Sequence, residues 1–200
     1  MRTTVDEYLS SAYDPDVDLV EGELEDRNVG EKDHAKLQLR AVRLLDTGNW
    51  FVTIETRLRI SPTRYRVPDV CVYEREPDEQ VFQTAPWIVI QILSPEDRMS
   101  RMQRKIEDYY AIGCRNIWIL DPWRRKAYEF DGTSIVEVSE LATRDSRINL
   151  GLAQLFSDCP MKRALSGALF RWRRPLRVTQ ASRRIRSARS LCRPCPPGIW

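Results

Sequence analysis

The 200-residue sequence has little of several residue types on which metal and phosphate sites are often built. It contains a single histidine, His34, so a zinc site made of several histidines is excluded. Its eight glycines form no glycine-rich phosphate loop, so no such motif supports a nucleotide-binding function. Residues 1–16 lack the apolar centre of a signal peptide, and no later apolar run is long enough to cross a bilayer. We therefore expect no membrane partner and a cytoplasmic location.

Cysteine is present, but not in a pattern that predicts disulfide bonds. The five cysteines are odd in number and irregularly spaced, which favours reduced thiols. Cys71 and Cys114 lie in apolar segments, so we expect both to be small core residues.

Acidic residues are absent from the C-terminal part of the chain. Eleven of the 32 basic residues follow Asp158, whereas none of the 29 acidic residues does, so residues 1–158 carry a net charge of −8. The sequence therefore predicts a folded domain over 1–158 and an Arg/Pro-rich tail over 159–200 without a core of its own. Two interpretations of the tail stay open: a basic arm that contacts phosphates, or a segment outside the natural reading frame.

The order of the apolar patterns predicts a mixed α/β sheet flanked by helices. We expect helices over 5–12 (with a capping box of Thr4 and Glu7), 30–48 (with Gly48 as C-cap) and 99–113. The predicted strands cover 50–60, 68–73, 87–93, 116–121, 126–130 and 134–138, with a hairpin or bulge around Gly22 and turns at 61–66 and 131–132.

Three polar side chains stand out against this pattern. Gln91 interrupts the apolar run of strand 87–93, where burying an amide is costly unless its donor and acceptor are satisfied. Asp69 follows Pro68 at the start of a strand, and Lys105 flanks the apolar stripe of helix 99–113. If these groups meet at one end of the sheet, acidic ligands for Mg²⁺ and a lysine could support phosphodiester hydrolysis.

At these residues the sequence resembles a known family. The segments "RVPDVCVY", "IVIQILSPEDR" and "KIEDYYAIGCRNIWILDP" are similar to successive motifs of the Uma-two family of restriction endonucleases, a branch of the PD-(D/E)XK nuclease superfamily, and the likeness runs from about residue 5 to 158. The resemblance implies a restriction-endonuclease-like core, a Mg²⁺ or Mn²⁺ cofactor and DNA as substrate. It places Asp69 at the metal-binding aspartate, Lys105 at the site lysine and Gln91 at a metal-binding glutamate.

Two functions follow from this resemblance. The first is a metal-dependent endonuclease that hydrolyses DNA and is impaired because Gln91 replaces a glutamate. The alternative is a degenerate, non-catalytic nuclease-fold module for binding or dimerisation; a homodimer is implied by the resemblance alone.

Simpler interpretations of the single residues stay open. Gln91 fits a residual metal ligand and a hydrogen-bonded buried amide about equally well. The acids around Gly22, Asp18 among them, are interpreted as a solvated hairpin, although one could point at the metal. His34 is expected to face solvent, and Arg66 is grouped with arginines that could contact phosphates, although solvation on the surface explains them almost as well.

Overall fold

The computed structural model describes residues 2–27, 31–95, 97 and 99–157. A six-stranded sheet forms its centre, with the order β10 (Ile135–Val138), β9 (Lys126–Phe130), β8 (Asn116–Asp121), β7 (Ile88–Ile92), β6 (Val70–Tyr73) and β3 (Phe51–Ile54). Strands β7 and β8 pair in parallel, and the other neighbours pair antiparallel, so the sheet is mixed.

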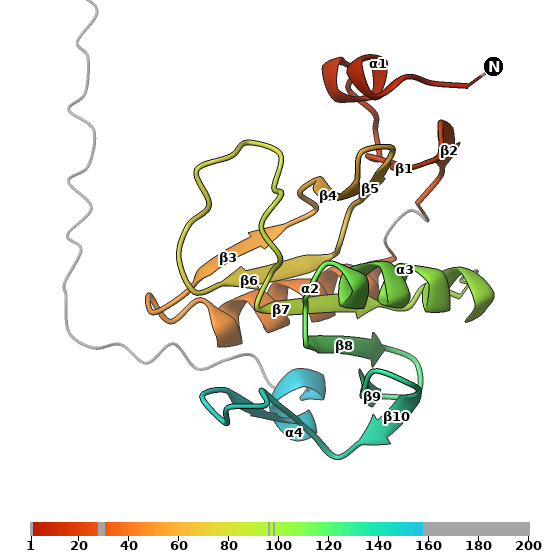
Figure 1. Ribbon diagram of the computed structural model, residues 1–200. Coiled ribbons are helices and arrows are strands. Elements are labelled where there is room, and N and C mark those ends of the chain that lie inside the picture. The colour runs from red at the N-terminus through yellow and green to blue at the C-terminus, as the bar shows by residue number, and fades with distance from the viewer. Residues whose placement is uncertain (1, 28–30, 96, 98, 158–200) are drawn as a thin grey trace, which may run out of the picture. The chain divides into compact units, whose positions relative to one another are not determined.

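A four-stranded sheet lies beyond the β6 and β3 side of the central sheet (Figure 1). Its order is β2 (Glu23–Glu25), β1 (Asp18–Val20), β5 (Arg64–Arg66) and β4 (Leu58–Ser61). A two-stranded sheet joins β11 (Glu140–Ala142) to β12 (Asn149–Gly151), and the helices are α1 (Val5–Ser10), α2 (Lys32–Leu45), α3 (Met99–Ala111) and α4 (Leu152–Phe156).

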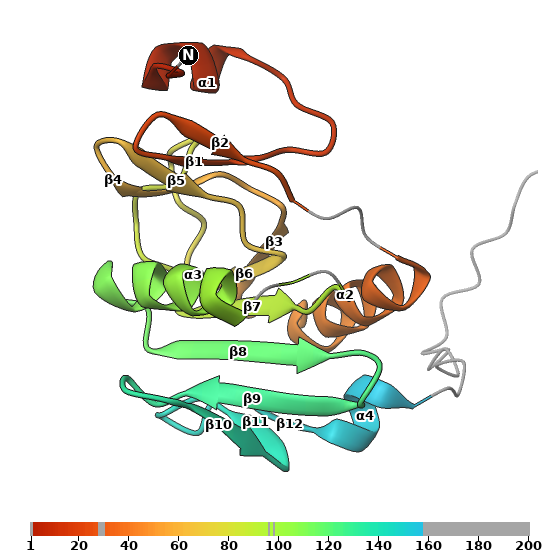
Figure 2. The same cartoon turned by 90° about the vertical axis from the view of Figure 1, so that its right-hand side faces the viewer.

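Helices α2 and α3 cover opposite faces of the central sheet (Figure 2). Side chains alternate between the two faces of a strand, so the even-numbered residues of β6, β7 and β8 pack with α2 and the odd-numbered ones with α3. The buried apolar residues are Leu37, Ala41 and Leu45 on α2, and Met102, Ile106 and Tyr109 on α3. Gln91 is odd-numbered, and its side chain accordingly meets Tyr109 of α3.

Most of the predicted elements form, and the differences have local causes. The capping box of Thr4 and Glu7 begins α1, as predicted. Gly48 is not the C-cap of α2: the helix ends at Leu45, and its C-cap is Asp46, whose backbone N–H donates to the carbonyl of Val42. Gly48 takes its positive φ in the segment that follows. The predicted turn over 61–66 contains strand β5, because Tyr65 pairs with Leu19 of β1, a partner that is distant in sequence.

No helix among the described residues is both long and apolar enough to span a bilayer. The predicted basic tail over 159–200 lies outside the described residues.

Candidate active site

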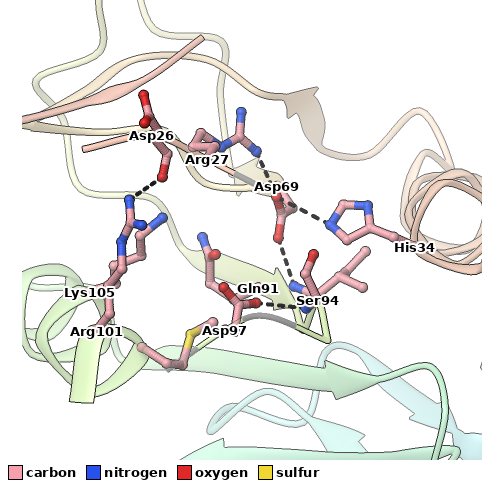
Figure 3. A pocket seen from close by; sticks show the side chains of 11 residues that line it. Asp26, Arg27, His34, Asp69, Gln91, Ser94, Asp97, Arg101 and Lys105 are labelled. Atoms are coloured by element: carbon pink, nitrogen blue, oxygen red, sulfur yellow. Dashed lines mark hydrogen bonds and ion pairs between the residues drawn. The ribbon is translucent and has the colours of Figure 1, made fainter. Parts of the chain in front are cut away.

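The three residues singled out in the sequence line one small pocket of about 30 Å³ (Figure 3). Asp69 directly precedes β6, Gln91 stands in β7, and Lys105 stands on α3. The full lining consists of Asp26, Arg27, His34, Asp69, Gln91, Ile92, Ser94, Asp97, Arg101, Met102 and Lys105. The fold therefore brings together side chains that stand on three different elements.

Asp69 is a buried carboxylate with both oxygens engaged. Its Oδ1 is 2.7 Å from Nη2 of Arg27 and 3.7 Å from Nε2 of His34, and its Oδ2 accepts a 2.7 Å hydrogen bond from the backbone N–H of Ile92. Burial alone would raise the pKa of Asp69, but His34 and the positive charge of Arg27 outweigh it, so the pKa is lowered. Asp69 is therefore held as a carboxylate.

Gln91 lies in the centre of β7 and is 3% exposed. Its Nε2 donates a 3.0 Å hydrogen bond to the hydroxyl of Tyr109 on α3. The amide donor is thus satisfied as a buried polar group requires, while the side chain also lines the pocket. The two interpretations of Gln91, buried amide and site residue, are compatible in this structure.

Lys105 reaches the pocket from α3 and pairs with an acid of the four-stranded sheet. Its Nζ lies 2.9 Å from Oδ2 of Asp18 on β1, and both side chains are almost fully buried. The interpretation of Asp18 as a solvated hairpin residue was wrong, because the hairpin of β1 and β2 turns this carboxylate inward, where the backbone N–H of Val67 also donates to it.

A buried arginine connects the acids around Lys105. Arg66 on β5 is 1% exposed on its side chain and contacts Asp18 at 3.2 Å, Glu25 at 2.7 Å and Asp108 at 2.8 Å. It thereby links β1 and β2 to α3, and it has no exposed face for a nucleic-acid backbone. The grouping of Arg66 with phosphate-contacting arginines was therefore wrong.

The positions of His34 and Arg27 beside Asp69 were not predicted from the sequence. His34 was expected to face solvent, but it is 7% exposed and lies beside Asp69. A signal for its burial exists, since His34, Leu37, Ala41 and Leu45 recur at steps of three and four on one face of α2. Burial would lower the pKa of His34, but Asp69 outweighs it and raises this pKa. No sequence signal identifies Arg27, whose pairing with Asp69 spans 42 residues.

The comparisons with known proteins show the family of this chain. The family model described as "Uma2: Putative restriction endonuclease" matches residues 5–133, and the chain therefore belongs to this family. The predicted family is thus confirmed. No curated protein matches the chain.

A solved structure shows the same fold. The chain is similar to a crystal structure described as a "putative nuclease belonging to DUF820 from Anabaena variabilis ATCC 29413", with a TM-score of 0.63 and 20% sequence identity. The match covers 77% of this chain and 97% of that one. This likeness confirms the predicted α/β fold, a mixed sheet flanked by helices.

Restriction endonuclease-like proteins generally use divalent metal ions, so the pocket must be compared with what such an ion requires. Mg²⁺ prefers several oxygen ligands with negative charge. The part of the chain that the structure describes has no group of three or more His, Cys, Asp and Glu side chains that could hold a metal. Asp69 is already bound by Arg27, and Gln91 brings an amide dipole where a glutamate would bring a charge.

The missing charge matters for a divalent ion. One pair of unit charges about 4 Å apart is worth roughly 4 kcal/mol before desolvation, at an effective dielectric constant of about 20. An amide at position 91 forfeits most of that attraction for each charge of the ion. As arranged here, the residues of the pocket do not fit a divalent metal.

Proposed function

We propose that this protein acts on DNA, and that the pocket of Asp69, Gln91 and Lys105 is where a phosphodiester bond is hydrolysed, at a rate impaired by Gln91. The observation that carries the proposal is the meeting of these three side chains in one pocket of a chain that belongs to the Uma2 family. The proposal adopts the substrate and the chemistry that the sequence resemblance implies.

Lys105 is the residue that we assign to the phosphate. An ammonium group has three N–H donors; among the described residues Lys105 pairs with Asp18, which leaves two donors for phosphate oxygens. A fixed cation in a partly closed pocket stabilises the negative charge that develops on these oxygens during hydrolysis. Asp18 holds the ammonium at the pocket, so its role is to position Lys105.

Asp69 and position 91 are where the Mg²⁺ or Mn²⁺ implied by the resemblance would be held. An ion of this kind would polarise the phosphate and lower the pKa of the attacking water. The residues at these positions do not fit the ion as they are arranged. We therefore expect the activity of this protein to be much lower than that of a site with a glutamate at position 91.

Nicking of supercoiled plasmid DNA tests this proposal. We expect Gln91→Glu to raise Mg²⁺-dependent nicking above the wild type, because it adds a second carboxylate to the pocket. Lys105→Ala, introduced into the Gln91→Glu chain, should abolish the gained activity. Matched controls are Gln80→Glu, which adds the same charge at an exposed loop position, and Lys36→Ala, which removes an exposed lysine. If Gln91→Glu nicks no faster than Gln80→Glu, the pocket is not the hydrolytic site.

One observation favours the second function, a non-catalytic nuclease-fold module that binds DNA or dimerises. The guanidinium of Arg27 occupies Oδ1 of Asp69, the carboxylate that would have to bind a metal ion in a metal-dependent reaction. Prolonged digestion separates the two functions. Slow nicking by the wild type that is lost in Lys105→Ala supports an impaired enzyme. Equal background nicking by the wild type and by Lys105→Ala supports the non-catalytic module.

A further inference from the structure

The carboxylate of Asp69 is already paired with a cation of the same chain, the guanidinium of Arg27. Nη2 of Arg27 lies 2.7 Å from Oδ1 of Asp69, and the side chains are only 10% and 6% exposed. Charged pairs of this length with a guanidinium are among the stronger hydrogen bonds in proteins. In Figure 3 the guanidinium of Arg27 lies against the carboxylate of Asp69, and it occupies Oδ1, one of the two oxygens that a metal ion could bind.

The position of Arg27 is supported from a second side. Its Nη1 lies 3.9 Å from Oε2 of Glu55, so the guanidinium stands between two carboxylates. The other oxygen of Asp69 is engaged as well, because Ile92 donates its backbone N–H to Oδ2. An incoming ion would have to displace the guanidinium from a buried pair before it could use Asp69.

The charges of the residues that line the pocket point in the same direction. The lining contains three acids, Asp26, Asp69 and Asp97, and an equal number of basic residues, Arg27, Arg101 and Lys105. The lining therefore has no excess of negative charge to attract a doubly charged ion, and Gln91 adds none. The presence of a guanidinium and an amide, at two separate positions, opposes a divalent metal.

We propose that Arg27 is a built-in cation that competes with a metal ion for Asp69, so that Gln91→Glu alone binds a divalent ion only weakly, at millimolar concentration, and tighter binding also requires the loss of Arg27. This inference concerns metal binding alone. It can fail while the proposed action on DNA holds, and it can hold while that action fails, because its readout involves no nucleic acid.

Binding of Mn²⁺ to the full-length protein provides the test, measured by calorimetry and by the electron paramagnetic resonance signal of the free ion. The wild type should show no saturable binding up to millimolar Mn²⁺. The double variant Arg27→Gln with Gln91→Glu should bind Mn²⁺ at least about tenfold more tightly than Gln91→Glu alone, because it no longer holds a positive charge against the ion. Adding Asp69→Asn to the double variant should remove this binding.

The control is the double variant Arg101→Gln with Gln91→Glu. Arg101 lines the same pocket but contacts the backbone carbonyl of Asp26 and the Glu25 carboxylate instead of Asp69, so it tests the loss of one positive charge in general. If the two double variants bind Mn²⁺ equally well, or if the Arg27 double variant gains nothing over Gln91→Glu, Arg27 is not the competing cation.

The wild type provides a test that leaves Arg27 unchanged, in case the Arg27 variants fail to fold. Mn²⁺ broadens the nuclear magnetic resonance signals of residues close to a bound ion. At millimolar Mn²⁺ we expect the backbone amide signals of residues 69, 91 and 92 to broaden no more than those of exposed acidic positions. Selective broadening at these three residues, abolished by Asp69→Asn, would overturn the proposal.

Discussion

Replacing the buried Arg66 by methionine should strongly destabilise the fold. Methionine keeps much of the volume but removes a guanidinium that contacts three carboxylates, those of Asp18, Glu25 and Asp108. Removing one partner of a buried ion pair typically costs about 3–5 kcal/mol, because the remaining charge is stranded away from water.

The remaining contacts place the expected loss near the lower end of that range. Asp18 keeps Lys105 at 2.9 Å, and Asp108 keeps Arg64 at 2.8 Å. Glu25 is 20% exposed, so water reaches it. We therefore expect the free energy of unfolding to fall by about 3 kcal/mol, which corresponds to a decrease in Tm of roughly 6–12 °C for a domain of this size.

Urea unfolding followed by circular dichroism, together with calorimetric melting, measures this loss. The matched control is Arg59→Met on the neighbouring strand β4, whose guanidinium donates to the exposed Gln83 and should contribute less than about 1 kcal/mol. A loss for Arg66→Met within about 1 kcal/mol of the control would refute the argument, because it would mean that the three acids do not depend on Arg66.

Two further predictions concern the thiols and the tail. Burial raises the pKa of Cys114 to about 12 and that of Cys71 well above its ordinary value, so neither thiol should form a reactive thiolate at pH 8. In a chain whose other three cysteines are serine, a thiol reagent should label neither residue until urea unfolds the protein, and rapid labelling of the native protein would contradict their burial. Deleting residues 160–200 should leave DNA affinity at the pocket largely unchanged; loss of binding in a gel-shift assay would instead support the basic-arm interpretation.

The sequence was sufficient for those features that depend on neighbours along the chain. The alternation in β6, β7 and β8 predicts which side chains share a face, since successive residues of a strand point to opposite sides. The capping box of α1 also involves only residues three apart. The family resemblance, carried by Asp69, Gln91 and Lys105, was sufficient to choose the positions that the fold brings together.

Only the tertiary structure showed which charges meet in the pocket. The pairs of Arg27 with Asp69 and of Lys105 with Asp18 join different elements, and a sequence offers many basic residues for each acid. The choice among them depends on strand order and on how the four-stranded sheet docks beside α3. Local patterns determined the strands of the sheet and the candidate residues. Long-range packing decided that Asp69 pairs with an arginine. Burial removes the water that would otherwise solvate each charge, so each buried charge needs a partner of opposite sign.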